Sequence, residues 1–266
     1  MSINETYKRQ GFYGPVKFLS ENENNYYKNQ LLECEKNLNL MNSDYRCKSN
    51  VLFPWVSELT SHPIVVDHVR SILGNDFHCW DTLIWIKKKS TNKFVSYHQD
   101  GTYWNFLPKM AGLTVWYTPS GATKENGCIK YIKNSHTHNQ LFHYDEKNKD
   151  NLLMRGQTAD IVPNDIFYAE CDPGSFYMHG PYMVHGSDNN NSDVDRLALG
   201  MIFVATHAKP ILNISEESTV MISGNDNYNY MVHDPKPIGN WEVDKVTWQK
   251  AYDRQHANYY KMEQLI

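Results

Sequence analysis

The chain has 266 residues and a formal net charge of −4, with 41% hydrophobic and 21% charged residues. This composition is typical of a globular protein that buries a core, and single all-β domains of this length are common. The absence of a long basic run argues against a nucleic-acid partner. The short run Lys87-Lys88-Lys89 is expected to be a solvated strand end.

The sequence carries no signal for export or for membrane insertion. Its first residues lack the apolar segment of a secretory signal, and no stretch approaches the roughly 18 apolar residues of a membrane span. The five cysteines are scattered and form no CxxC pair, which argues against a disulfide framework or a thiolate zinc site. A cytoplasmic protein is therefore expected. No apolar helix face nominates a dimer surface.

Helical signals come first along the chain. Ser20 and Glu23 have the spacing of a capping box, and apolar residues then recur at helical spacing. A second helix is predicted over 64–73, ending at Gly74. A third helix is predicted over about 241–264.

From Phe77 onward, short strand-like runs alternate with turns rich in Gly, Asn and Pro. The predicted strands are 82–86, 94–97, 113–117, 128–132, 166–168, 175–178 and 197–204. We therefore expect a mainly β protein with flanking helices, either a sandwich or a jelly roll. The chain is treated as one domain, 1–266, with N-terminal helices over about 20–75, a β core over about 77–210 and a C-terminal extension over 211–266.

A histidine and an aspartate lie two residues apart directly after a predicted strand. At strand spacing, His98 and Asp100 would point to one side and face one cavity. A third ligand is expected from His185, at the end of another apolar run. Two histidines and one carboxylate on one face of an iron leave positions open for a chelating co-substrate and for O₂. Because the chain has 12 histidines, the alternative is a strand-end histidine beside a surface aspartate.

Arg196 follows His185 by eleven residues, on the next β-rich run. A buried arginine requires an anionic partner, because an unpaired buried charge is unfavourable. A carboxylate gripped by the guanidinium fork would satisfy it. The alternative is a structural ion pair with Asp193 or Asp195.

Four motifs follow one another along the chain. They are Phe94 to Trp104 with its HxD, Glu125-Asn126-Gly127-Cys128 with Asn134-Ser135-His136, His179-Gly180, and His185-Gly186-Ser187 with Asn190 and Arg196. In this order they resemble the phytanoyl-CoA dioxygenase (PhyH) family of iron(II)- and 2-oxoglutarate-dependent oxygenases. The resemblance extends from about Gln10 to the region of Asp234, and Asn134 stands where the family usually has glycine.

The resemblance implies a double-stranded β-helix (jelly-roll) core. It implies that His98, Asp100 and His185 bind iron(II), and that Arg196 binds the co-substrate 2-oxoglutarate with help from the hydroxyl of Ser187. O₂ is then the oxidant.

The histidine of the third motif, His179, is interpreted as structural rather than as a ligand, because the separation of His185 and Arg196 fits the distal position.

Substrate residues are expected close to the HxD motif. Trp104 falls where relatives such as ectoine hydroxylase place an aromatic residue in the substrate pocket, and its alternative is core packing. Tyr103 and Asn105 are further candidates, together with Trp116 and Tyr182. Aromatic residues on strands fill cores at least as often as they line pockets.

The resemblance favours a dioxygenase that hydroxylates a C–H bond of a small free metabolite and releases succinate and CO₂. No basic groove for the phosphates of coenzyme A can be assigned in the sequence. Asp100 favours oxygen insertion, because halogenating relatives carry a small residue at that position. The alternatives are an acyl-CoA hydroxylase of the same family, a cupin-type enzyme with zinc or another metal, and a ligand-binding protein without turnover.

Overall fold

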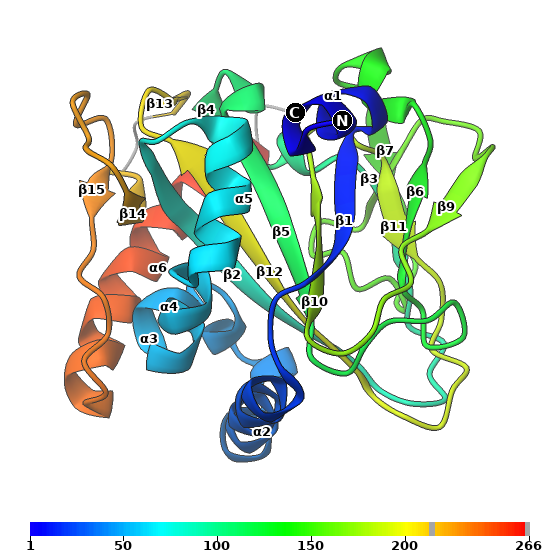
Figure 1. Ribbon diagram of the computed structural model, residues 1–266, viewed down its shortest axis with the longest axis horizontal. Coiled ribbons are helices and arrows are strands. Elements are labelled where there is room, and N and C mark those ends of the chain that lie inside the picture. The colour runs from blue at the N-terminus through cyan, green and yellow to red at the C-terminus, as the bar shows by residue number, and fades with distance from the viewer. Residues whose placement is uncertain (213–215, 264–266) are drawn as a thin grey trace. The chain divides into compact units, whose positions relative to one another are not determined.

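A computed structural model describes residues 1–212 and 216–263 (Figure 1). The α-helices are α1 (Ile3–Gln10), α2 (Glu21–Leu38), α3 (Ser49–Leu52), α4 (Pro54–Thr60), α5 (Pro63–Leu73) and α6 (Trp241–Glu263). The three predicted helices correspond to α2, α5 and α6, although Gln264 lies outside the described residues. The capping box before α2 is formed: the N–H of Glu23 donates to Ser20 Oγ at 3.3 Å, and the N–H of Ser20 donates to Glu23 Oε2 at 2.8 Å.

Strands dominate the part of the chain that follows α5. The strands are β1 (Phe12–Lys17), β2 (Phe77–Lys87), β3 (Val95–His98), β4 (Phe106–Leu107), β5 (Gly112–Thr118), β6 (Ile129–Ile132), β7 (His143–Asp145), β8 (Gln157–Ala159), β9 (Ile166–Tyr168), β10 (Ser175–His179), β11 (His185–Ser187), β12 (Arg196–Ala205), β13 (Lys209–Pro210), β14 (Ser218–Ser223) and β15 (Val232–His233). Every predicted strand coincides with one of them, namely β2, β3, β5, β6, β9, β10 or β12. The expectation of a mainly β protein with flanking helices is confirmed.

The chain folds into two compact units, each built from segments that are far apart in the sequence. The first unit comprises Met1–Lys28, Trp85–Thr102 and Trp116–Ala198. The second comprises Asn29–Ile84, Tyr103–Val115 and Leu199–Ile266. Strands β2, β5 and β12 have residues in both units. The description of 1–266 as one domain stays a prediction.

In the first unit, two groups of strands share an aromatic core. β1 pairs with β10, and a four-stranded sheet has the order β3-β11-β6-β9 (Figure 1). Phe12 of β1 stacks on Tyr131 of β6, with ring centroids 4.7 Å apart. Phe167 of β9 and Tyr177 of β10 complete this cluster. The sheet that carries β3 and β11 is therefore held by aromatic packing against β1 and β10.

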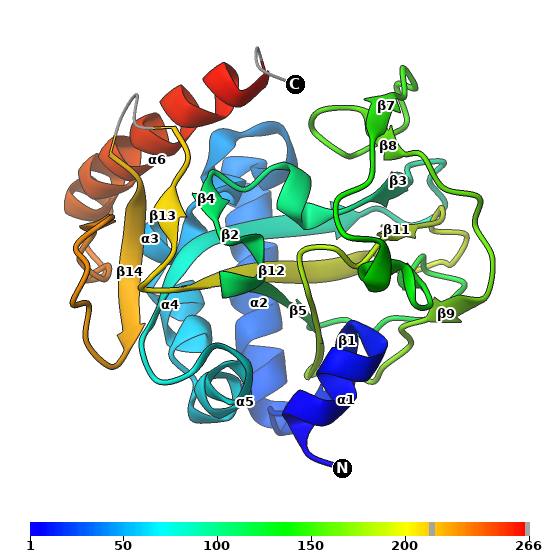
Figure 2. The ribbon, with the colours of Figure 1, turned by 90° about the horizontal axis from the view of Figure 1, so that it is seen from above.

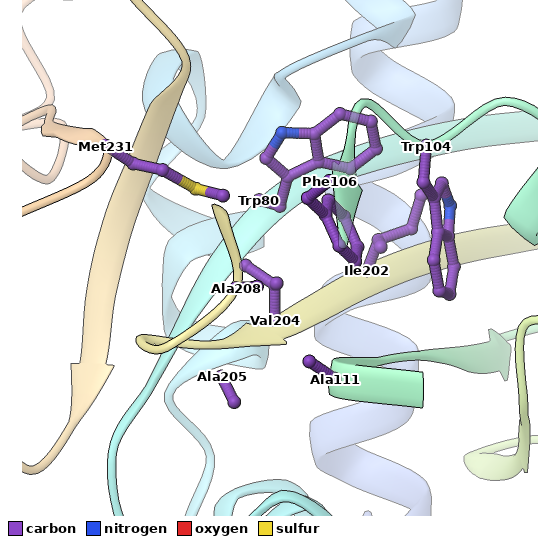
Figure 3. Packing of buried hydrophobic residues seen from close by; sticks show 9 residues of the cluster. All are labelled: Trp80, Trp104, Phe106, Ala111, Ile202, Val204, Ala205, Ala208 and Met231. Carbon is purple, nitrogen blue, oxygen red and sulfur yellow. The ribbon is translucent and has the colours of Figure 1, made fainter. Parts of the chain in front are cut away.

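In the second unit, the strands lie in the order β5-β12-β2-β14-β15. A buried cluster fills the unit beside β2, β4 and β12, and its members include Trp80, Phe106 and Val204 (Figure 3). Val51 of α3 and Ala251 of α6 pack against β14, and Figure 2 shows these two helices beside that strand. Within the described residues, no helix combines the length and apolar character that crossing a membrane requires.

Candidate active site

His98, Asp100 and His185 come together in the first unit. His98 ends β3, Asp100 opens the short 3-10 turn that follows, and His185 is paired with His98 across β3 and β11. His98 Nε2 lies 3.4 Å and His185 Nε2 lies 3.5 Å from Asp100 Oδ1. Ligand atoms about 2.0–2.2 Å from one metal ion lie about 3–3.5 Å from one another. The three side chains therefore have the separation that a shared metal ion requires.

The orientation of both histidine rings is fixed by the main chain. Nδ1 of His98 lies 2.9 Å from the carbonyl of Ser96, and Nδ1 of His185 lies 2.9 Å from the carbonyl of Met183. Each Nδ1 can only donate to such a carbonyl, so Nε2 is the unprotonated nitrogen. Burial, with His98 and His179 nearby, holds the pKa of His185 well below its ordinary value. A neutral imidazole with its lone pair on Nε2 is the form that binds metals.

Asp100 is ionised, and its Oδ2 atom is bound by His179. Burial would raise its pKa, but the nearby His185 and a hydrogen bond from His179 keep the pKa well below the ordinary value. His179 Nε2 lies 3.1 Å from Asp100 Oδ2, and its Nδ1 lies 3.0 Å from the hydroxyl of Tyr131. His179 thus binds the carboxylate oxygen that does not face the other two histidines. This contact favours the interpretation of His179 as structural.

Arg196 opens β12 and is only 1% exposed. Its Nε and Nη1 atoms have no hydrogen-bond partner among the described residues, and its guanidinium lies 5.6 Å from the ring centre of Trp116. Burial lowers the pKa of Arg196 to about 10, so the group is still a cation at neutral pH. Asp195 instead accepts from the N–H of Lys89 at 2.8 Å. A buried cation with unused donors fits an anionic ligand.

Lys87, at the end of β2, is a buried amine near Arg196, and its position corrects the expectation of a solvated strand end. Lys88 and Lys89 are exposed, but Lys87 is 1% exposed. Its Nζ donates to Ser187 Oγ at 2.8 Å and to the carbonyl of Asp188. Burial and the charge of Arg196 lower the pKa of Lys87 to about 6.

The sequence offered little signal for Lys87, since three consecutive lysines usually indicate a solvent-facing segment. Only the end of a continuous apolar strand beside it hinted at burial.

The strand β11 links the histidine–aspartate group to these two basic side chains. His185 and Ser187 are two residues apart in β11, so their side chains leave the same face of the strand. Their Cα atoms are roughly 7 Å apart by strand geometry. Ser187 Oγ carries the contact to Lys87. A five-carbon dicarboxylate has a suitable length to reach from one group to the other.

The substrate candidates Trp104, Tyr103 and Asn105 lie in the second unit, whereas Trp116 and Tyr182 lie in the first. Trp104 is 2% exposed and stacks on Phe106 at 5.2 Å, inside the cluster of Figure 3. Asn105 donates to the carbonyl of Leu212 at 3.0 Å and to Glu217 Oε1 at 2.6 Å. Tyr103 is half-buried. These contacts give Trp104 and Asn105 structural roles, and a role in substrate binding stays a prediction for all five candidates.

Residues 7–198 match the family described as "Phytanoyl-CoA dioxygenase (PhyH)". The chain belongs to this family. Its members are iron(II)- and 2-oxoglutarate-dependent oxygenases that use O₂, so the expected enzyme class and cofactors are those of the family. A "Probable phytanoyl-CoA dioxygenase" of Caenorhabditis elegans is 26% identical over 154 residues, covering 55% of this chain and 49% of the relative. A Dictyostelium discoideum "Phytanoyl-CoA dioxygenase domain-containing protein 1 homolog" is 25% identical over 41% of this chain and 40% of the relative. The matches thus span about half or less of the curated relatives.

Solved structures share the fold of this PhyH protein. "Non-heme monooxygenase; ThoJ apo" superposes with a TM-score of 0.89 at 20% identity, over 100% of both chains. "CytC3 with Fe(II) and alpha-ketoglutarate" has a TM-score of 0.65 at 18% identity, over 86% of this chain and 91% of CytC3. EctD from S. alaskensis has a TM-score of 0.65 at 15% identity, over 87% and 86% of the two chains. The expected jelly-roll fold is confirmed.

Proposed function

We propose that this protein is an iron(II)- and 2-oxoglutarate-dependent dioxygenase that hydroxylates a C–H bond of a small free metabolite. In this proposal His98, Asp100 and His185 bind the metal. Arg196, Lys87 and Ser187 bind the distal carboxylate of 2-oxoglutarate. Succinate and CO₂ are the co-products.

The observation that carries the proposal is the buried, incompletely satisfied guanidinium of Arg196. A second buried amine, Lys87, lies within its electrostatic reach and holds the hydroxyl of Ser187. The charge of Arg196 disfavours a proton on Lys87, and an anion beside them would offset that repulsion. A dicarboxylate co-substrate supplies that anion, whereas a cupin-type isomerase or hydrolase has no use for such a pocket.

The donor set fits iron(II). Two neutral imidazoles and one carboxylate on adjoining elements are the ligands that leave further positions of a six-coordinate iron open. When bound, the iron, 2-oxoglutarate and O₂ supply the oxidising power for C–H hydroxylation, with loss of CO₂ from 2-oxoglutarate.

The chain's own groups have distinct tasks. Asp100 offers Oδ1 to the metal, while His179 donates to Oδ2 and prevents the carboxylate from rotating. The carbonyls of Ser96 and Met183 hold the two histidine rings in one tautomer. Arg196 and Lys87 orient the co-substrate.

Three lines of reasoning support a hydroxylase acting on a small molecule. Asp100 occupies the position that halogenating relatives leave open for chloride, which favours oxygen insertion. One structural neighbour, the "epimerase SnoN in complex with Fe3+, alpha ketoglutarate and nogalamycin RO", binds a small molecule, at a TM-score of 0.64 and 14% identity. The net charge of −4 also gives no general attraction for the phosphates of an acyl-CoA.

The test is turnover of 2-oxoglutarate to succinate by protein reconstituted with iron(II), without and with a panel of free acids, amino acids and acyl-CoA esters. We expect one or more free metabolites to stimulate succinate release and to gain a hydroxyl group. Stimulation by acyl-CoA esters alone would transfer the assignment to an acyl-CoA hydroxylase. An absence of succinate under every condition would contradict the oxygenase proposal.

Adjacent lysines provide a matched control for the co-substrate pocket. Lys87→Ala and Arg196→Ala should each raise the KM for 2-oxoglutarate by about 30-fold or more, since removing one partner of a buried charge pair costs about 2 kcal/mol or more. The exposed neighbour Lys88 forms a surface ion pair with Asp195 at 3.4 Å. Lys88→Ala should therefore leave the KM unchanged. An equal effect of the two lysine substitutions would refute the assignment of Lys87.

A further inference from the structure

A second group of metal-ligating side chains lies in the second unit. His78, Asp226 and His233 each offer a ligand atom, and these atoms lie within 4.8 Å of one another. Asp226 Oδ2 is 3.0 Å from His233 Nε2 and 3.7 Å from His78 Nε2. Three ligands at about 2.0–2.1 Å from a tetrahedral ion would be about 3.3 Å apart. The observed spacings lie on either side of that value.

The sheet brings the two histidines to one face. His78 of β2 is opposite Met221 of β14, and His233 of β15 is opposite Thr219 of the same strand. Residues 219 and 221 are two apart, so their side chains and those of their partners leave the same face. The histidine rings lean together, with centroids 5.0 Å apart. Asp226 arrives from the connection between β14 and β15.

His78 and Asp226 are in the state that binds a metal. Burial, followed by the nearby His233, lowers the pKa of His78 to about 4, so His78 is a neutral imidazole. Its side chain is 1% exposed, and no described residue bonds to its Nδ1. Burial would raise the pKa of Asp226, but the N–H groups of Tyr228 and Asn229, with His233, hold it below its ordinary value.

The group of His78, Asp226 and His233 is accessible to solvent through His233. The side chain of His233 is 38% exposed, whereas that of Asp226 is 2% exposed. Oδ1 of Asp226 is occupied by the two main-chain donors, at 2.9 and 3.0 Å, so Oδ2 is directed at the histidines. An ion could enter beside His233 and keep a water molecule as a fourth ligand.

We propose that His78, Asp226 and His233 form a second metal site for a zinc-class divalent ion, distinct from the iron site of the proposed function. Imidazole nitrogens with one carboxylate suit Zn²⁺ and its neighbours in the transition series, rather than Mg²⁺ or Ca²⁺. The bound ion ties the connection between β14 and β15 to β2. Its role is structural, because it links three segments across the edge of the sheet.

A surface ion pair is the competing explanation. His233 and Asp226 at 3.0 Å would make such a pair without any metal. That pair gives no role to His78, a buried neutral imidazole whose ring faces His233. A metal ion accounts for all three side chains.

The test counts bound Zn²⁺ in untagged protein that has been stripped with a chelator, re-equilibrated with Zn²⁺ and freed of excess ion. The substitutions are His233→Ala, at an exposed side chain, and the nearly isosteric Asp226→Asn, in the natural chain and in a His98→Ala/His185→Ala background. His207→Ala is the matched control, because His207 is an exposed histidine of the same unit outside the group. The midpoint of thermal unfolding with and without Zn²⁺ is a second measurement.

We expect the His98→Ala/His185→Ala background to bind one equivalent of Zn²⁺ and to gain thermal stability from it. His233→Ala and Asp226→Asn should each lose that equivalent and that gain, while His207→Ala keeps both. If the background binds no zinc, or if His233→Ala binds as much as His207→Ala, the second site does not exist. The background lacks both histidine ligands of the proposed iron site, so this outcome does not depend on the proposed function.

Discussion

His98 and His185 reach the same carboxylate oxygen because each ring is oriented by the carbonyl two residues before it. This local arrangement needs only a strand end and a histidine. Asp100 depends on more distant residues, since its second oxygen is held by His179 and, through it, by Tyr131. The residues around the metal position therefore differ in what their replacement should do.

The His179 side chain should position Asp100 without binding the metal. His179→Gln retains a donor, so it should still bind one equivalent of iron(II). His179→Phe removes the donor and should weaken iron binding by about 10–100-fold, the usual effect of losing a partner of a ligand. His185→Ala should abolish binding. Anaerobic iron(II) titration measures all three, and complete loss in His179→Gln would make His179 a ligand instead.

Lys87 should take up a proton when 2-oxoglutarate binds. Its pKa of about 6 leaves it mostly neutral at pH 7.5, and a neighbouring carboxylate raises the pKa toward its ordinary value. The proton is bound more tightly in the complex, so affinity for 2-oxoglutarate should fall as pH rises above about 6.

Calorimetry in buffers of different ionisation enthalpy measures this proton uptake. Uptake should approach one proton per 2-oxoglutarate at pH 7.5 and vanish in Lys87→Met. Equal uptake in Lys87→Met would assign the proton to another group.

Most residues of the proposed site could be predicted from the sequence, but not all of them. The HxD spacing and the distal His185 predicted that His98, Asp100 and His185 lie together, and Arg196 was expected to be buried. Two contacts could not be predicted, namely Lys87 to Ser187 and His179 to Asp100. Their partners are separated in the chain by 100 and 79 positions, respectively. Such pairs follow from strand register, which one sequence does not reveal.

At the level of elements, β11 is the short strand on which the site depends. It pairs with β3 through His185 and His98, and with β6 through Gly186 and Lys130. Apolar patterning suggested a strand before His185, but the strand begins at His185, because Gly180 to Met183 form a turn closed by the N–H of Met183 at 3.1 Å. β1 was not predicted, because Gly14-Pro15 interrupts the alternation of apolar and polar residues that indicates a strand.

Gly186 should be required for the spacing of β11 and β3. A Cβ at this position would lie 2.7 Å from the carbonyl oxygen of Val95. Gly186→Ala should therefore push the strands apart, lower the free energy of unfolding by about 1–3 kcal/mol and weaken metal binding. Chemical denaturation and iron(II) titration measure the two effects. Unchanged metal affinity would mean that the ligands tolerate this displacement.

At the level of the whole molecule, stability draws on the cluster of Figure 3. Trp104→Ala should remove the stacking on Phe106, leave a cavity and cost about 3–5 kcal/mol of unfolding free energy. Trp104→Phe should retain much of the unfolding free energy that Trp104→Ala loses. A stable Trp104→Ala protein that has lost only substrate turnover would instead support the pocket role. Urea denaturation followed by circular dichroism distinguishes the two.

The two units are each assembled from three discontinuous segments, which composition and strand patterning could not indicate. The residues of the proposed iron and 2-oxoglutarate site all belong to the first unit, whereas the proposed zinc site belongs to the second. The chemistry and the structural metal are therefore assigned to different parts of one chain.

The central claim is that one chain binds iron(II) through His98, Asp100 and His185 and 2-oxoglutarate through Arg196. Anaerobic titration of the metal-free protein with iron(II) and then 2-oxoglutarate tests it directly, by the weak visible charge-transfer absorption of the chelate. We predict that the absorption appears in the natural protein, is lost in His185→Ala, and in Arg196→Ala requires far more 2-oxoglutarate. Iron binding without this absorption, or an unchanged titration in Arg196→Ala, would contradict the account.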